Sequence, residues 1–129
     1  MLKLENITKI YEGKNFKQIA LNDVTLAFRN NEFVSILGPS GSGKTTLLNI
    51  IGGLDKYTYG NLIIDGVSTK KYKERDWNNY RSKKVGFIFQ SYNLINHQTV
   101  LSNVLLSLNI AGKPKKESIK LAKKVLKDV

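Results

Sequence analysis

The first residues of the chain alternate between apolar and polar side chains, as a half-buried β-strand does. Leu2, Leu4 and Ile7 are the apolar members of this pattern and predict an N-terminal strand. Tyr11 then leads into the polar stretch 12–15, which predicts a loop.

A second alternating pattern covers residues 20–28 and predicts another half-buried strand, with a candidate bulge at Asn22-Asp23. Its apolar members are Leu21, Val24, Leu26 and Phe28. No helical pattern separates the two strands, so they are expected to pair antiparallel. Together they predict a small β layer beside the core that follows.

The pattern changes after a predicted turn at Asn30-Asn31. The continuous apolar and β-branched run 32–37 predicts a fully buried strand. Residues 45–54 have the apolar spacing of a helix that is buried on more than one side, and Gly52-Gly53 is expected to end it. Its apolar residues are Leu47, Leu48, Ile50, Ile51 and Leu54.

Three further elements are predicted in the middle of the chain. Residues 61–64 predict a strand that enters a turn at Asp65-Gly66, because Asp-Gly is a common hairpin turn. The mostly polar stretch 70–84 predicts a short surface helix. The apolar run 85–89 predicts another buried strand, which ends in Gln90.

Two helices are predicted in the last third of the chain. After a loop over residues 91–98, Thr99 is expected to cap a helix that Gly112 ends. A last helix from Pro114 has one apolar face, made by Ile119, Ala122, Val125, Leu126 and Val129. Its other face is rich in lysine. A basic amphipathic helix can lie on a membrane, but this one lacks aromatic anchors, which favours a solvated outer face.

Composition narrows the class of protein. A chain of 129 residues fits one domain, and the absence of cysteine excludes disulfides and thiolate metal sites. No signal-peptide pattern or bilayer-spanning apolar run is present, so we expect a soluble or peripheral protein. The net charge of +11 admits nucleotide, nucleic acid or an anionic membrane as partner. Nucleic acid is not expected, because neither an RNP pattern nor zinc-finger spacing occurs.

The nucleotide has a motif in the chain, the phosphate-binding P-loop or Walker A pattern G-x-x-x-x-G-K-[ST]. Its residues are Gly38, Pro39, Ser40, Gly41, Ser42, Gly43, Lys44 and Thr45. The glycines allow backbone N–H groups to approach an anion, and the following helix adds the positive end of its dipole. The alternative is a glycine turn that caps an ordinary helix, which the apolar run before the loop disfavours.

Side chains of the motif suit a nucleotide with Mg²⁺. Lys44 can reach the β- and γ-phosphates, the Thr45 hydroxyl is a hard ligand for Mg²⁺, and Thr46 can turn its hydroxyl to the α-phosphate. Asp65 offers a second metal ligand, because an apolar strand that ends in Asp is also typical of the Walker B carboxylate. Gly66 directly after it favours the hairpin turn instead.

Several separated landmarks agree with one family. They are Tyr11, the P-loop, Phe87-Ile88-Phe89-Gln90, Asn93-Leu94-Ile95 and the stretch from Thr99 to Val104. Together they resemble the nucleotide-binding subunit of ABC transporters, most closely the branch for lipoprotein release and for macrolide and antimicrobial-peptide export. The resemblance covers the whole chain but about half of the family's domain. It implies an α/β fold, a P-loop NTPase core with an antiparallel β layer (1–90), followed by the Q-loop and the start of a helical subdomain (91–129).

The resemblance also implies roles for single residues. Tyr11 corresponds to the aromatic residue that stacks on adenine, although an exposed loop tyrosine would otherwise be an ordinary feature. Gln90 corresponds to the Q-loop glutamine, which joins Mg²⁺ and senses the γ-phosphate; the alternative is a polar residue that ends a strand. Lys44 and Gln90 are the expected catalytic residues. Ser91–Leu106 corresponds to the part that meets a transmembrane permease.

The implied activity is ATP hydrolysis that drives export, on the inner face of the cell membrane, with a second nucleotide-binding domain as dimer partner. No Ser-Gly-Gly signature follows residue 43, no apolar run ends in Asp-Glu, and no switch histidine occurs after such a run. We therefore expect an N-terminal piece that is inactive alone.

The alternatives are a truncated nucleotide-binding module without turnover, a small P-loop kinase or GTPase, or an ABC protein acting on ribosomes or DNA. The GTPase lacks support because Asn-Lys-x-Asp is absent.

Overall fold

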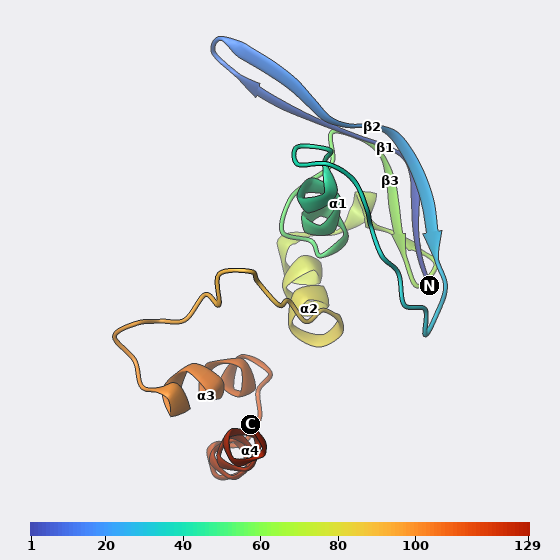
Figure 1. Cartoon of the computed structure of the whole chain (residues 1–129). Coiled ribbons are helices and arrows are strands. Elements are labelled where there is room, and N and C mark those ends of the chain that lie inside the picture. Colours follow the sequence, from blue (N-terminus) through green and yellow to red (C-terminus); the bar gives the residue numbers. More distant parts are fainter. The chain divides into compact units, whose positions relative to one another are not determined.

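A computed structural model describes all 129 residues, and the chain divides into two units. The first is Met1–Arg81 and the second is Ser82–Val129. The first unit contains the whole sheet and the P-loop helix, and the second contains the last two helices (Figure 1). Each unit is described by itself.

The first unit is built on a four-stranded antiparallel sheet. Its strands are β1 (Leu2–Gly13), β2 (Phe16–Phe28), β3 (Tyr59–Ile64) and β4 (Val67–Ser68), in the order β2-β1-β3-β4. The apolar residues of the predicted strands that become fully buried are Leu4, Ile7 and Leu62. The antiparallel β layer predicted from the sequence is therefore present.

The β1–β2 hairpin is longer than the sequence pattern predicted. Tyr11 was expected to lead into a loop, but it lies in β1, where it pairs with Gln18 of β2. The pairing continues to Gly13 and Phe16, so only two residues form the turn. The polar side chains of this arm face solvent on both sides, which is why alternation gave no sign of it. In Figure 1 the arm extends beyond the rest of the sheet.

The predicted bulge at Asn22-Asp23 is confirmed. Ile7 pairs with Val24 and Lys9 pairs with Leu21, so two residues of β2 stand opposite one residue, Thr8, of β1. Asp23 has a φ of 52°, and its N–H donates to the Thr8 hydroxyl at 3.1 Å. A bulge of this kind bends the strand and increases its twist.

Asp65 and Gly66 form the tight turn between β3 and β4, as predicted. Their φ values are 49° and 81°, which fit a two-residue hairpin turn with both central residues left-handed. The Asp65 carboxylate accepts a hydrogen bond from the N-terminal ammonium of Met1 at 3.0 Å. Asp65 therefore follows β3 directly and lies in the hairpin turn, where its carboxylate contacts the N-terminus.

Two helices pack against each other in the first unit. The P-loop helix α1 (Lys44–Ile51) ends at Gly52, and its buried residues are Leu47 and Ile50. A short 3-10 helix η1 (Thr69–Lys71) leads to α2 (Glu74–Lys84). The expected surface helix buries two aromatic residues, Trp77 and Tyr80, and the Tyr80 hydroxyl donates to the Ile51 carbonyl at 2.8 Å. Burial, together with the charges of Tyr72 and Asp65, raises the pKa of Tyr80.

Gly53 makes this helix contact possible. Its φ is 71°, and a Cβ there would lie 2.6 Å from Cε3 of Trp77. Its carbonyl accepts a hydrogen bond of 2.7 Å from the Arg81 guanidinium. The end of α1 is thereby tied to α2 by both packing and a charged donor.

Two predicted strands do not form. Residues 32–37 and 85–89 pair with no strand of the sheet and have no regular secondary structure. Phe33 and Ile88 are almost completely exposed. An apolar run becomes a buried strand only when neighbouring strands satisfy its backbone groups, and here none do. The prediction of two buried strands was wrong for this structure.

The second unit has two packed helices, α3 (Val100–Ile110) and α4 (Lys115–Asp128). The cap predicted at Thr99 is confirmed, since its side chain accepts from the Ser102 N–H at 3.1 Å. Ala122 is fully buried on the apolar face expected for α4, but Val125 and Val129 of that face are exposed. The buried stripe is thus narrower than predicted.

Candidate functional site

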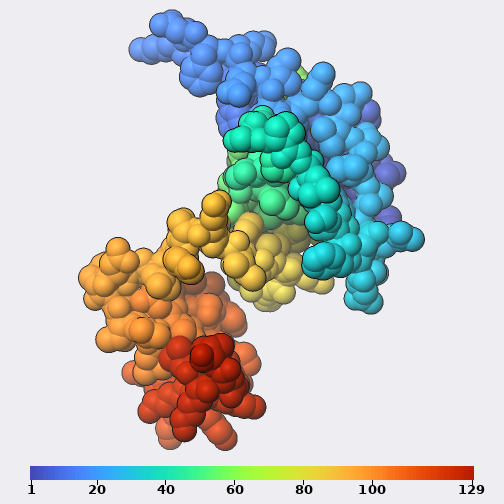
Figure 2. Space-filling model, in the orientation of Figure 1, coloured from blue at the N-terminus to red at the C-terminus, as the bar shows by residue number.

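The P-loop wraps around the N-terminus of α1. Gly43 is the N-cap residue with a φ of 84°, and its carbonyl accepts the first helical hydrogen bond from Leu47 at 2.8 Å. A Cβ at Gly43 would lie 2.5 Å from the Ala20 carbonyl oxygen of β2. Only glycine allows the loop to lie this close to the strand. In Figure 2 the turquoise loop lies beside the base of the blue hairpin.

Lys44 lies inside the loop rather than reaching outward. Its ammonium donates to the carbonyl oxygens of Gly38 at 2.8 Å and Pro39 at 2.7 Å, and it lies 3.4 Å from the Ser42 hydroxyl. The Ser42 N–H also donates to the Pro39 carbonyl at 3.3 Å. The charge of Lys44 is therefore held at the centre of the motif.

The loop and the hairpin line an open hollow of about 510 Å³, which is within the range of small-molecule sites. Loop and helix residues line one side, and they are Ser40, Gly41, Gly43, Lys44, Thr45 and Thr46. Hairpin residues line the other side, and they are Tyr11, Gln18 and Ala20. The structure thus brings Tyr11 and residues of the P-loop to the same hollow.

Tyr11 is held by two neighbours. Its hydroxyl donates to the Oδ2 atom of Asp55 at 2.7 Å. The Lys9 ammonium lies 4.6 Å from the centroid of the tyrosine ring, which is within cation–π distance. Lys9 also donates to Oδ1 of Asp55 at 2.7 Å and to the Lys56 carbonyl at 2.7 Å. The hydroxyl end of the ring is therefore anchored by Asp55, and one face of the ring is covered by Lys9.

The Asp55 carboxylate is the centre of this cluster. Burial opposes its ionisation, but the hydrogen bonds from Lys9, from Tyr11 and from the Lys56 N–H together outweigh burial and lower the pKa of Asp55. Its side chain is 28% exposed, and that of Lys9 is 11% exposed. An ion pair so little exposed is weakly screened by salt.

The oxygen ligands that line the hollow suit a magnesium ion that is held partly by the protein and partly by substrate phosphates. The Thr45 hydroxyl lies in the same hollow as Lys44. No group of three His, Cys, Asp or Glu side chains in the chain could hold a metal ion by itself. Mg²⁺ is commonly held by few protein oxygens together with substrate phosphates, so a single hydroxyl beside a phosphate loop suits it.

Gln90 belongs to the second unit. It is exposed and lies in a turn directly after residues 85–89. In the loop that follows, the Asn103 side chain of α3 accepts from the Ile95 N–H at 2.8 Å and donates to the Ile95 carbonyl at 3.2 Å. This pair of bonds fastens the loop to the helix. The adjacent hollow of about 600 Å³ is lined by Phe87 and by residues of the loop and of α3.

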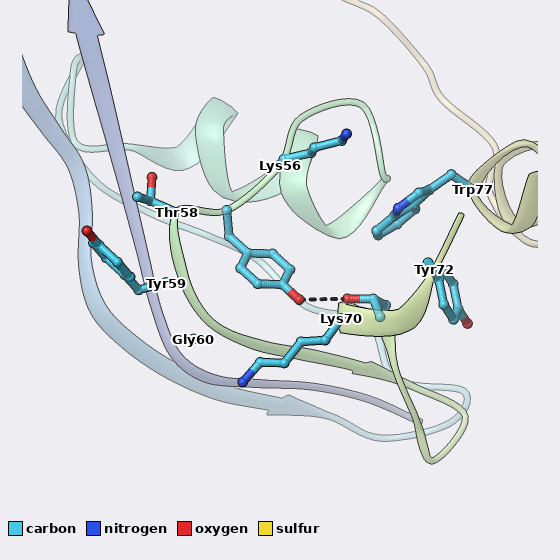
Figure 3. A pocket seen from close by; sticks show the side chains of 9 residues that line it. Lys56, Thr58, Tyr59, Gly60, Lys70, Tyr72 and Trp77 are labelled. Carbon is cyan, nitrogen blue, oxygen red and sulfur yellow. Dashed lines mark hydrogen bonds between the residues drawn. The ribbon is translucent and has the colours of Figure 1, made fainter. Parts of the chain in front are cut away.

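A separate hollow of about 500 Å³ lies on the first unit, away from the predicted site residues (Figure 3). Four aromatic side chains line it, and they are Tyr57, Tyr59, Tyr72 and Trp77. The Tyr57 hydroxyl is hydrogen-bonded to the Thr69 hydroxyl at 3.1 Å, which closes one side. Lys56 and Lys70 are its charged members. None of the P-loop residues contributes to it.

Sequence reasoning missed three residues around the hollow beside the P-loop. Lys9 had a detectable signal, because it precedes Tyr11 by two positions and so shares its strand face. Gln18 becomes a neighbour of Tyr11 only through the hairpin register. Asp55 lies 44 residues from Tyr11, and nothing local marks it.

None of the helices combines the length and the apolar character that a bilayer crossing requires.

The known proteins that this chain resembles all point to one family. A family model described as "ABC transporter" matches residues 21–129. The chain is 42% identical over 125 residues to the bacitracin export ATP-binding protein BceA of Halalkalibacterium halodurans, covering 97% of the chain and 49% of the relative. It is 40% identical over 126 residues to the lipoprotein-releasing system ATP-binding protein LolD of Bacteroides thetaiotaomicron, covering 98% and 56%.

A solved structure agrees with these sequence relatives. It is the dimeric post-hydrolysis state of the ATP-binding cassette MJ0796 of Methanocaldococcus jannaschii, bound to ADP and Pi. The TM-score is 0.88 at 44% identity, covering 98% of this chain and 56% of that chain. The likeness confirms the expected α/β P-loop NTPase fold. The chain spans about half the length of these relatives.

Proposed function

The chain belongs to the ABC transporter ATP-binding family, and we propose that it binds ATP with Mg²⁺ as part of a subunit that drives export across a membrane. The observation that carries this proposal is the single hollow that joins the P-loop to Tyr11. A phosphate cradle on one side and an aromatic ring on the other match the two ends of a nucleotide. The names of BceA and LolD, which are ATP-binding proteins for export and for lipoprotein release, support the same role.

In this proposal each side of the hollow has its own task. The backbone N–H groups of the loop from Gly38 to Gly43 and the N-terminus of α1 hold the phosphates. Lys44 contributes charge to the β- and γ-phosphates, and the Thr46 hydroxyl faces the α-phosphate. Tyr11 stacks on adenine.

The Thr45 hydroxyl would hold Mg²⁺ beside the phosphates, and Gln90 is proposed as a second oxygen ligand of the metal. When bound, Mg²⁺ neutralises charge that develops on the phosphate oxygens. Lys44 adds to that stabilisation as a fixed positive charge, and Gln90 orients the attacking water. Both residues are therefore proposed as catalytic in a complete ATPase.

Two partners are proposed. The segment Ser91–Leu106 would meet a transmembrane permease, and a second ATP-binding domain would pair with this one. The dimeric MJ0796 structure supports pairing in the family. Exposed apolar side chains on the proposed permease segment, such as Leu94 and Val100, support a contact surface there. The location that follows is peripheral, on the cytoplasmic face of the cell membrane.

The 129-residue polypeptide alone is proposed to bind ATP without turning it over. Its sequence has no Ser-Gly-Gly signature and no apolar run that ends in Asp-Glu. Without a carboxylate to orient the attacking water, the rate should fall by a factor on the order of 10² to 10⁴. A dimer of this polypeptide would lack the same groups twice.

The test is phosphate release from ATP with Mg²⁺, compared between the 129-residue polypeptide and its Lys44→Ala variant. We expect equal rates at every protein concentration. Addition of a separate polypeptide that carries the remaining half of a family domain should restore turnover in the wild type only. Phosphate release by the polypeptide alone that depends on Mg²⁺ and Lys44 would contradict the proposal and return attention to Asp65.

A further inference from the structure

The contacts of Tyr11 restrict which way its ring can face. The hydroxyl is anchored to Oδ2 of Asp55 at 2.7 Å, and the Lys9 ammonium lies 4.6 Å from the ring centroid. Lys9 is itself fixed by bonds of 2.7 Å to Asp55 and to the Lys56 carbonyl. The cation that covers one ring face is therefore not free to leave it.

This arrangement matters because the ring stands on an arm that little else supports. The tip of the β1–β2 hairpin beyond Tyr11 is exposed, with no third strand beside it. Stacking is effective only when the ring plane is parallel to the base, so a freely rotating tyrosine would lose much of its effect. Asp55 belongs to the segment after α1, which connects the ring to the same helix that carries the P-loop.

We infer that Asp55 and Lys9 are positioning residues, which fix the ring plane of Tyr11 at the distance from the P-loop that an adenine nucleotide requires. Lys9 covers one face of the ring, so the base stacks on the other. This inference rests on the proposed function. It adds that the fixed ring makes the site bind a nucleotide, which carries an aromatic base, more tightly than inorganic polyphosphate.

A purely structural role would give a different result. The Lys9–Asp55 pair also ties β1 to the segment after α1, and its loss could loosen the whole first unit. Loosening would weaken the binding of every ligand to the P-loop. Loss of ring position would weaken only ligands that carry a base.

The experiment measures the dissociation constants of ATP and of inorganic triphosphate by titration calorimetry on the full 129-residue chain. The variants are Tyr11→Phe, Asp55→Ala and the double variant, with Glu5→Ala as control. Tyr11→Phe keeps the ring and removes only the hydroxyl bond, so it does not leave a buried charge unpaired. Glu5 is a carboxylate of the same strand that pairs with Lys3 at 2.8 Å and does not line the hollow. Thermal melting by circular dichroism checks that each variant is folded.

We expect the dissociation constant of ATP to rise about three- to tenfold in Tyr11→Phe and in Asp55→Ala, while that of triphosphate stays within about twofold. The double variant should bind ATP no more weakly than Asp55→Ala alone, because both changes break one interaction. Glu5→Ala should leave both constants unchanged.

Two outcomes would overturn the inference while leaving the proposed function in place. One is an unchanged ratio of ATP to triphosphate affinity in both single variants. The other is a neutral Tyr11→Phe with a changed ratio in Asp55→Ala alone, because the bond between the tyrosine hydroxyl and Asp55 would then not set the ring. Failure of the wild type to bind either ligand would instead overturn the proposed function, and this inference with it.

Discussion

The ammonium group of Lys44 lies 2.7 Å from the carbonyl oxygen of Pro39, within the loop that precedes its own helix. The residue that we propose as the cation for a phosphate therefore also fastens the loop that would hold that phosphate. The shape of the loop and the positive charge that it offers to a ligand therefore depend on the same side chain. Substitution of Lys44 should affect both, though to very different degrees.

Lys44→Ala is expected to abolish nucleotide binding while lowering the free energy of unfolding by less than about 2 kcal/mol. The phosphates lose their central cation, whereas the fold loses only hydrogen bonds in a solvent-exposed loop. Calorimetric titration of ATP and urea unfolding measure the two effects. Lys14→Ala, at the exposed turn of the hairpin, is the control for the change in net charge. Equal ATP affinity in wild type and Lys44→Ala would refute the P-loop assignment.

Tyr11→Ala should lower the affinity for ATP by about 5- to 100-fold and hardly change the affinity for inorganic triphosphate, because only stacking on the base is lost. Parallel titrations with the two ligands give the comparison. Tyr59→Ala serves as the matched variant, since Tyr59 is an exposed strand tyrosine that does not line the P-loop hollow. A similar loss for both ligands would show that Tyr11 does not contact adenine.

Asp65→Asn should leave Mg²⁺-dependent ATP binding unchanged, because Asp65 is a hairpin-turn residue with a φ of 49°. Asparagine tolerates this left-handed conformation well, so the free energy of unfolding should change by less than about 1 kcal/mol. ATP titrations with and without Mg²⁺ measure the metal dependence. A large loss of that dependence would make Asp65 a magnesium ligand and revive the small-kinase alternative.

Gly53→Ala should destabilise the first unit more than Gly66→Ala. Both glycines have left-handed φ values, which cost an alanine about 1 to 2 kcal/mol. A Cβ at Gly66 meets nothing within 4 Å, whereas one at Gly53 lies 2.6 Å from the Trp77 ring and should cost roughly another 1 to 3 kcal/mol. Urea unfolding of both variants gives the difference. Equal destabilisation would show that α2 does not pack on the end of α1.

The contribution of Asp55 to stability should depend on pH in a defined direction. Its pKa in the folded chain is lowered from an ordinary value of 3.8, because the bonds from Lys9, Tyr11 and Lys56 outweigh the effect of burial. The carboxylate therefore stabilises the fold above about pH 4, and this stabilisation is lost as the pH falls through the lowered pKa.

Urea unfolding of wild type and Asp55→Ala over a range of pH tests this prediction. The difference in unfolding free energy should be constant between about pH 7 and pH 5 and should shrink below about pH 4. A difference that grows on acidification would mean that the carboxylate is not paired in the folded chain.

Features that depend on neighbours in the sequence were determined by the sequence alone. The Asp65-Gly66 turn, the Thr99 cap and the helix after the P-loop all follow from the conformational preferences and short-range hydrogen bonds of a few adjacent residues. The P-loop belongs to this class, because its glycines and the start of α1, which form the proposed phosphate cradle, lie within nine residues of one another.

Features that depend on distant partners were decided only by the tertiary structure. The runs 32–37 and 85–89 have the composition of buried strands, but strand hydrogen bonds come from other segments, and no segment of this chain supplies them. The arm that carries Tyr11 is a strand because β2 pairs with it, despite its polar side chains. The bond from Tyr11 to Asp55 joins residues 44 positions apart, so it follows from packing of the hairpin against the end of α1 and leaves no periodic trace in the sequence.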